Sequence, residues 1–297
     1  MTDRGYIGLD LGGTAVKAAF VHTAGGIVVG RTHTSDTPRT GSPQQLIEAL
    51  VEAAHRVAGD HEAIAVGVGV PGQFSDATGR LRALPNVPGP WEGFPLRDLL
   101  ATELGLPIHL VNDAQAFTLA ETTLGAAVGR QTVLGMTLGT GIGGGICIAG
   151  RIHRGAHGTA GEIGHQMIVA DGPPCGCGRH GCLESVAKSA VLAFLAGTPT
   201  ATEVFDAVEA GDPKAIEALK TVTGYLGMGL ANVVAVLDPD VIVIGGGLAQ
   251  AGDLLLDPLR AALHRNLSVT PPGSGTIVVG TIGTLAGAVG AALACIV

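Results

Sequence analysis

Short apolar runs alternate with amphipathic, helix-like stretches along most of the chain. "YIGLDL" at 6–11, "AVKAAFV" at 15–21 and "GIVVGRTH" at 26–33 predict three consecutive strands. Ser42 and Pro43 predict the start of an amphipathic helix that runs to about Ala58, because serine is a favoured N-cap and proline a favoured first helical residue. A buried strand, "AIAVGVGV", follows and ends at Pro71-Gly72. This alternation is typical of α/β proteins with buried sheets.

The same alternation continues after a loop rich in proline and glycine at 71–95. We expect a strand at 106–113, a helix at 114–126, a strand pair at 132–150, helices over 185–237, a strand at 240–247 and a helix at 257–267. Residues 151–184 show neither pattern. A stretch of that length inside a compact domain is usually functional or held by a clip.

Composition narrows the class of protein. Hydrophobic residues make up 46% and charged residues 14%, which indicates a globular chain with a large core. The net charge of −8 and the lack of a Lys/Arg run disfavour nucleic-acid and anionic-membrane partners.

The uncharged segment 276–297 is long enough to span a bilayer, but its β-branched start and its breaks at Gly280 and Gly283 favour a buried strand followed by a closely packed helix. Without a signal-peptide pattern, we expect a cytoplasmic protein with reduced thiols.

Two glycine turns are candidate phosphate sites. "DLGGT" at 10–14 lies between two predicted strands, so it is neither a Rossmann fingerprint nor a P-loop, and an ordinary hairpin is the alternative. "LGTGIGGG" at 138–145 repeats the strand, turn, strand pattern as a faint internal echo. Backbone amides at such turns can hold phosphates. Thr14 and Thr140 add hydroxyl groups, and Asp10 suits a hydrated Mg²⁺ ion.

Three of the five cysteines, Cys175, Cys177 and Cys182, lie within eight positions. With one histidine they would form a tetrahedral Cys₃His zinc site, for which His165 and His180 are both near in sequence. Three unpaired thiols or a disulfide are the alternatives, and both are less expected in a reducing compartment. Four protein ligands leave no open position, so the zinc would be structural and would fasten 151–184.

Several motifs together resemble known families. The two glycine turns and "VIGGG" at 243–247 are similar to the phosphate and adenosine segments of the actin/hexokinase-type ATPases. "HGTAGEIGHQ" at 157–166 and "CGCGRHGCLE" at 175–184 resemble, more narrowly, the ROK family, over a region from Tyr6 to the C-terminus. The resemblance implies an α/β, two-domain actin-like ATPase (ribonuclease H-like, duplicated) fold with an active-site cleft between domains. We expect a small domain at 1–113, on which a helix at about 283–297 could pack back, and a large domain at 114–297 that includes the zinc loop.

The resemblance also implies an activity, ATP-dependent phosphorylation of a hexose at its 6-hydroxyl, with glucose as the first candidate. It makes Asp113 the catalytic base and His165 the fourth zinc ligand. The sugar would be bound by Gly72, Asn86, Asn112, Asp113, Glu162, His165 and Glu184. ATP and Mg²⁺ would be bound by Asp10, Gly12, Gly13, Thr14, Lys17, Gly139, Thr140, Gly141, Gly245, Gly246 and Gly247.

Other readings stay open at this point. Asp113 precedes a predicted helix and would also serve as an N-cap. Other hexoses or N-acetylhexosamines could be the substrate, and polyphosphate could replace ATP. A sugar-responsive repressor is disfavoured because no helix-turn-helix precedes the first strand, and a non-catalytic sugar-binding module is disfavoured because Asp10 and Asp113 are both present. We expect a homodimer or homotetramer formed through the larger C-terminal domain, because the resemblance implies it and because the helical region 212–237 has more apolar residues than one sheet face needs.

Overall fold

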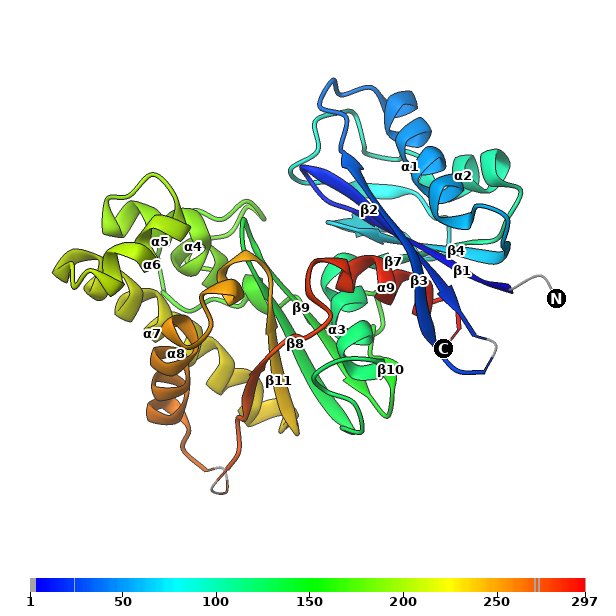
Figure 1. Cartoon of the computed structure of the whole chain (residues 1–297). Helices are drawn as coiled ribbons and strands as arrows, with labels where there is room; N and C mark the ends of the chain where they lie inside the picture. Colours follow the sequence, from blue (N-terminus) through cyan, green and yellow to red (C-terminus); the bar gives the residue numbers. More distant parts are fainter. Residues whose placement is uncertain (1–3, 24, 270, 272, 297) are drawn as a thin grey trace. The chain divides into compact units, whose positions relative to one another are not determined.

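The chain folds into two compact units. The computed structural model describes residues 4–23, 25–269, 271 and 273–296. One unit comprises Met1–Thr123 with Ile282–Val297, and the other comprises Leu124–Thr281. Each unit is built on a five-stranded mixed sheet, so the predicted α/β fold is confirmed (Figure 1).

The sheet of the first unit begins with the predicted meander. Its strand order is β3-β2-β1-β4-β7, with the first three strands antiparallel and with β4 and β7 parallel to β1. The strands are β1 (Arg4–Leu11), β2 (Ala15–His22), β3 (Val28–Asp36), β4 (Glu62–Val70) and β7 (Ile108–Asn112). A two-stranded ribbon, β5 (Gln73–Phe74) with β6 (Leu81–Ala83), lies within the loop predicted at 71–95.

Helices cover both faces of this sheet (Figure 1). They are α1 (Pro43–Ala58), α2 (Leu96–Leu104), α3 (Asp113–Thr123), the 3-10 helix η3 (Gly283–Leu285) and α9 (Ala286–Leu293). α1 has the predicted bounds, and Ser42 caps it by accepting a hydrogen bond from the backbone N–H of Gln45. α3 ends three residues before the predicted position, at Thr123. The sequence-based boundary at 113 therefore falls at the start of α3, whereas the compact unit continues to the end of this helix.

Within the first unit, the backbone of α9 packs directly against the backbones of β1, β4 and α3. A Cβ atom added to Gly8 of β1 would lie 1.8 Å from the carbonyl oxygen of Ala288, and one added to Gly67 of β4 would lie 1.7 Å from that of Ala291. On its other side, a Cβ atom on Gly290 would lie 1.7 Å from the carbonyl oxygen of Ala116 in α3. No side chain fits at these three positions. The apolar C-terminal helix can therefore pack this closely only because each position is a glycine.

The second unit repeats the strand arrangement of the first. Its order is β10-β9-β8-β11-β12, with an antiparallel β8–β9 hairpin and with β11 and β12 parallel to β8. The strands are β8 (Thr132–Leu138), β9 (Ile142–Ile148), β10 (Arg151–Ile152), β11 (Val241–Gly245) and β12 (Ile277–Val279). In both sheets a hairpin is followed by parallel strands on the side of its first strand, as the internal echo in the sequence suggests.

Helices pack on this second sheet around an extensive apolar core. They are α4 (Leu183–Ala187), α5 (Ser189–Ala196), α6 (Ala201–Glu209), α7 (Pro213–Leu237) and α8 (Asp253–Asn266), with the 3-10 helices η1 (Ile163–His165) and η2 (Gly247–Ala251). α8 begins four residues earlier than predicted, at Asp253. Between β10 and α4 the chain forms only turns, isolated bridges and η1, so the predicted irregular stretch is confirmed.

The uncharged C-terminal segment and the apolar helix α7 differ in how far they meet what a membrane span requires. The C-terminal segment 276–297 is divided into β12, η3 and α9, as predicted from its glycines, and is no continuous helix. Among the described residues one helix, α7, is long and apolar enough to cross a bilayer. Its apolar window is 50% buried inside the protein, as in the core helix of a folded domain.

Candidate active site and metal centre

Several predicted residues of the first unit lie at one edge of its sheet. β1, β4 and β7 are parallel, so their carboxyl ends lie at the same edge, where ligands of open α/β sheets bind. Asp10 lies opposite Gly69 in the β1–β4 register, and Val70 lies opposite Asn112 in the β4–β7 register. Asp113 follows Asn112 directly. The ends of three strands that are separate in the sequence thus meet at one edge and bring Asp10 to the same edge as Asn112 and Asp113.

The first glycine turn is held from both sides. Gly12 donates to the carbonyl oxygen of Ala15 at 3.0 Å, which closes the β1–β2 hairpin. Thr37, after β3, donates through Oγ1 to the carbonyl oxygen of Gly12 at 2.7 Å, and its N–H donates to the carbonyl oxygen of Thr14 at 3.0 Å. The side chain of Thr37 is buried. Sequence reasoning missed this residue, because no local motif marks a contact between residues 25 positions apart.

Asn86 packs against the same turn. A Cβ atom added to Gly13 would lie 3.0 Å from both Cβ and the carbonyl oxygen of Asn86. Asn86 itself has a φ of 65°, a left-handed conformation that asparagine tolerates better than most residues. Gly72 lies close to the strand that leads to Asn86, since its added Cβ would be 2.5 Å from the carbonyl oxygen of Ala83.

Asp10 is a half-buried carboxylate in a crowded position. Burial raises the pKa of Asp10, and the neighbouring Lys17 ammonium, opposite it across the hairpin, acts in the other direction. A Cβ atom added to Gly287 of α9 would lie 2.6 Å from the carboxyl carbon of Asp10. Because the ionised form is costly here, a bound cation would be favourable at this carboxylate.

The start of α3 corrects one alternative reading of Asp113. Asn112, and not Asp113, is the N-cap: its Oδ1 accepts from the N–H groups of Ala114 at 3.0 Å and Gln115 at 3.2 Å. Asp113 is the first helical residue, and its Oδ1 accepts from the N–H of Ala114 at 2.8 Å. Asparagine caps a helix about as well as aspartate does. Asn112 therefore supplies the cap of α3, and the cap does not depend on the carboxylate of Asp113.

In the second unit, two glycine motifs lie side by side. The turn at 139–141 ends β8, and Gly245–Gly247 ends the neighbouring parallel strand β11. Gly246, with a φ of 83°, packs on Leu138, where an added Cβ would lie 2.3 Å from the carbonyl oxygen. A Cβ atom added to Gly139 would lie 4.0 Å from the backbone nitrogen of Gly247, so the two turns are close neighbours. Backbone groups from both motifs are therefore exposed to the same small region, as a bound phosphate or nucleotide would need.

The predicted sugar-binding carboxylates of the second unit are neighbours. Burial raises the pKa of Glu162; the nearby His165 opposes this shift, and the negative charge of Glu184 adds to it. Glu162 Oε2 lies 3.8 Å from His165 Nε2. Glu184, in the first turn of α4, accepts a hydrogen bond through Oε2 from the N–H of Ile142 at 2.9 Å. This contact ties Glu184 to the glycine turn, and no local sequence motif predicts it.

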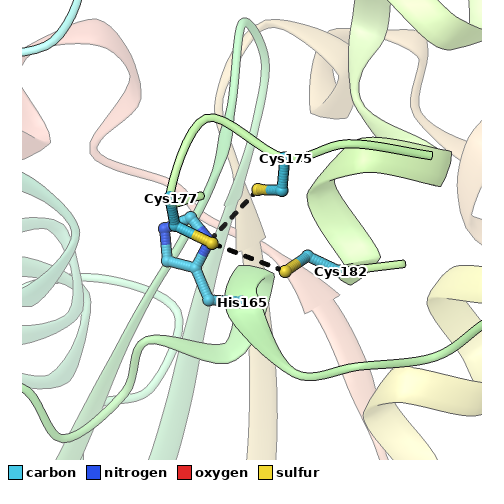
Figure 2. Close-up of side chains that lie close together, drawn as sticks. All are labelled: His165, Cys175, Cys177 and Cys182. Atoms are coloured by element: carbon cyan, nitrogen blue, oxygen red, sulfur yellow. Dashed lines mark hydrogen bonds between the residues drawn. The ribbon is translucent and has the colours of Figure 1, made fainter. Parts of the chain in front are cut away.

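A cluster of potential metal ligands forms within the irregular stretch (Figure 2). One ligand atom each from His165, Cys175, Cys177 and Cys182 lies within 4.8 Å of all the others. Cys175 Sγ is 3.6 Å from His165 Nδ1, and Cys177 Sγ is 3.6 Å from Cys182 Sγ. Tetrahedral zinc with metal–sulfur bonds of about 2.3 Å requires sulfur atoms roughly 3.8 Å apart, so the four side chains fit such an ion.

His180, the other histidine candidate, lies outside this cluster. Its Nδ1 contacts the carbonyl oxygen of Gly172 at 3.2 Å.

The thiols of the cluster differ in their acidity. A hydrogen bond from the backbone N–H of Arg179 is the main cause that lowers the pKa of Cys177, whereas burial, with the neighbouring thiols, raises the pKa of Cys182 to about 12. A divalent cation would displace the proton of Cys182, as metal binding to thiols generally does.

The predicted site residues thus fall into two groups, one in each unit. Asp10, Gly12–Thr14, Lys17, Gly72, Asn86, Asn112 and Asp113 belong to the first unit. The second unit carries residues 139–141, Glu162, His165, the three clustered cysteines, Glu184 and 245–247. Within each group the side chains and turns lie close to one another.

Comparisons with known proteins show the family to which the chain belongs. The model of the ROK family matches residues 6–296. A glucokinase of Halalkalibacterium halodurans is 36% identical, with 98% of this chain and 94% of the relative covered. An N-acetylgalactosamine kinase of a Shewanella species is 34% identical, with 97% and 96% covered. The solved structure of a ROK family glucokinase from Streptomyces griseus, in complex with glucose and AMPPNP, superimposes with a TM-score of 0.83 at 32% identity and covers 97% of this chain and 98% of that one.

The buried charge of Asp10 predicts a gain in stability when it is removed. Because burial raises the folded-state pKa of Asp10 above its ordinary value of 3.8, the ionised carboxylate is a net cost at neutral pH. We expect Asp10→Asn to raise the melting temperature of the ligand-free protein at pH 7, by roughly 2–4 °C for each kcal/mol relieved. The gain should shrink as pH falls through the raised pKa, because wild-type Asp10 then becomes neutral.

Thermal unfolding followed by circular dichroism at several pH values measures this effect. Asp36→Asn is the matched control: Asp36 is an exposed aspartate at the end of β3 in the same sheet, and its replacement should change the melting temperature little. A lower melting temperature for Asp10→Asn at neutral pH would show that the charge stabilises the fold.

Proposed function

Because the chain belongs to the ROK family, we propose that it is an ATP-dependent hexose kinase that phosphorylates glucose at the 6-hydroxyl. The observation that carries this proposal is the near-complete match, in sequence and in fold, to glucokinases, one of them solved with glucose and an ATP analogue. The placement of Asp10, Asn112 and Asp113 at one sheet edge and of two glycine motifs beside each other supports it.

In the first unit, Asp113 would act on the sugar. Phosphoryl transfer passes through a loose transition state, so positioning and charge neutralisation contribute more than proton removal. Asp113 would orient the 6-hydroxyl and accept its proton during attack on the γ-phosphate. Asn86, Asn112 and the backbone of Gly72 would bind other hydroxyl groups. Asp10 would hold a hydrated Mg²⁺ ion, which when bound neutralises charge on the phosphates.

In the second unit, the two glutamates would bind the sugar and the glycine turns would bind ATP. Glu162, His165 and Glu184 would bind sugar hydroxyls, which carboxylates accept well in a water-poor pocket. The amides of Thr140 and Gly141 would hold phosphate, since the amide of Gly139 already donates to the carbonyl oxygen of Gly141 within the same turn. Gly245–Gly247 would lie along the nucleoside.

Zinc would be the structural ion of the cysteine cluster. His165 and the three cysteines would complete a closed tetrahedral site, which leaves no position for substrate. The ion would fasten the irregular stretch predicted at 151–184, where regular backbone pairing is sparse, and so hold Glu162 and Glu184 in place.

The identity of the sugar is the finer part of the proposal. The relatives include an N-acetylgalactosamine kinase as well as glucokinases, so kinases for other hexoses and N-acetylhexosamines are the second candidate. A homodimer or homotetramer stays a prediction.

A coupled assay of ADP release tests the activity and the sugar together. With MgATP and a panel of glucose, mannose, fructose, N-acetylglucosamine, N-acetylmannosamine and N-acetylgalactosamine, we expect the highest kcat/KM for glucose. A higher value for another sugar would reassign the substrate within the same activity. No ADP release above background with any sugar would contradict the kinase assignment.

Asp113→Asn should separate catalysis from folding. Asparagine keeps the size of the side chain but cannot accept the hydroxyl proton, so kcat should fall about 10²–10⁴-fold. The melting temperature should stay near that of the wild type, since Asn112 caps α3. Asn112→Ala is the stability control and should destabilise the protein by about 1 kcal/mol through loss of the cap. Near-native turnover of a well-folded Asp113→Asn protein would rule out the catalytic role.

The metal centre predicts one zinc ion per chain in the purified protein. Cys177→Ala should lose the ion, as measured by elemental analysis, and should lower the melting temperature and the sugar affinity together. Cys295→Ala removes a thiol outside the cluster and should retain the metal. Metal-free wild-type protein that is fully active and stable would show that the cluster needs no ion.

A further inference from the structure

Glu184 makes a contact that binding a sugar does not require. Its Oε2 accepts a hydrogen bond from the N–H of Ile142 at 2.9 Å, across 42 residues of sequence. The adjacent Gly141 permits this approach, because an added Cβ atom there would lie 2.6 Å from the same oxygen. The carboxylate therefore rests directly on the backbone of the second glycine turn.

The turn is held at its other end by the same segment of chain. Gly139 donates to the carbonyl oxygen of Gly141 at 3.0 Å, which closes the turn. The carbonyl oxygen of Gly139 in turn accepts from the N–H of Ser189, the first residue of α5, at 3.0 Å. Glu184 and Ser189 thus hold the exit and the entry of the turn.

Glu184 lies close in sequence to the cluster of candidate metal ligands. It follows Cys182, the N-cap residue of α4, by two positions. The N–H of Leu183 donates to the carbonyl oxygen of Gln166 at 2.9 Å, and Gln166 follows His165. Residues next to two of the candidate metal ligands therefore determine where the carboxylate of Glu184 lies.

We propose that Glu184 is a positioning residue for the phosphate-binding turn at 139–142 as well as a ligand for the sugar. This inference rests on the proposed kinase function. A turn that binds phosphate through backbone amides is effective only if those amides are already oriented when the ligand arrives. An ionised acceptor makes a stronger hydrogen bond to an amide than a neutral one, so Glu184 can fix this orientation.

The consequence is a coupling between the two substrates within one unit. A carboxylate accepts several hydrogen bonds, so a sugar hydroxyl can bind Glu184 while Ile142 remains bonded. Sugar that orders Glu184 also orders the turn, and nucleotide that orders the turn also orders Glu184. Such coupling is reciprocal, because each ligand must change the affinity of the other by the same factor.

Three variants separate this role from sugar binding. Glu184→Ala removes the acceptor for Ile142 and the sugar contact. Glu184→Gln retains a carbonyl oxygen that can accept from Ile142 but loses the charge. Glu162→Ala removes the neighbouring acidic side chain, which contacts His165 and not the turn. All three should first show a cooperative thermal transition and the metal content of the wild-type protein.

The affinity for MgADP, measured by calorimetry without any sugar, is the first readout. We expect it to fall about 10-fold in Glu184→Ala, as for loss of one charge-assisted hydrogen bond, to be largely restored in Glu184→Gln, and to be unchanged in Glu162→Ala. Glucose affinity should fall in all three. Nucleotide binding by Glu184→Ala that equals the wild type, or an equal loss in Glu162→Ala, would overturn the proposal.

Amide hydrogen exchange of the ligand-free protein is the second readout. The peptide that contains Ile142 should exchange faster in Glu184→Ala than in the wild type, and not in Glu162→Ala. If the wild-type protein binds no nucleotide, the kinase function itself fails, and exchange at Ile142 then decides alone whether Glu184 holds the turn. Unchanged exchange in Glu184→Ala would overturn that role.

Discussion

The first unit depends on the close approach of α9 to the sheet. Gly8 and Gly67 allow the backbone of α9 to contact β1 and β4 directly, and Gly290 allows the same contact with α3. This packing places the first turn of α9 against the carboxylate of Asp10, with Gly287 at the point of contact. The position of the proposed cation ligand therefore follows from glycines far away in the sequence. A larger residue at any of these points would have to displace backbone or the carboxylate.

The two units hold their glycine turns by analogous means. In each, a hairpin ends at a glycine turn, and a polar side chain from a distant segment bonds to the turn. Thr37 donates to the carbonyl oxygen of Gly12, and Glu184 accepts from the N–H of Ile142. The backbone arrangement is the same in both units. The side chain that bonds to the turn is a hydrogen-bond donor, Thr37, in the first unit and an acceptor, Glu184, in the second. Only the side chain in the second unit, Glu184, is a carboxylate that lies beside the candidate metal ligands, and the proposed function assigns it to sugar binding as well.

The sequence predicted the elements well because their signals are local. Ser42-Pro43 marked the start of α1, the apolar runs marked the strands, and Gly280 and Gly283 marked the break before α9. It failed where the decisive contact is long-range or where neighbours compete. Asn112, and not Asp113, caps α3, because two adjacent residues were both suitable caps. The contacts of Thr37 and Glu184 with the turns arise only when distant segments pack together.

The carboxylates of the proposed site carry a cost in stability that a bound ligand would offset. Burial raises the pKa of both Asp10 and Glu162, so each ionised group opposes folding at neutral pH. Asp240 shows the contrasting structural case: its carboxylate accepts from the backbone N–H groups of Thr132 and Gln131, which lower its pKa. A carboxylate that serves the fold is matched to donors within the protein. Asp10 and Glu162 keep charges that the fold does not fully compensate, as expected where a cation or a sugar supplies the missing partner.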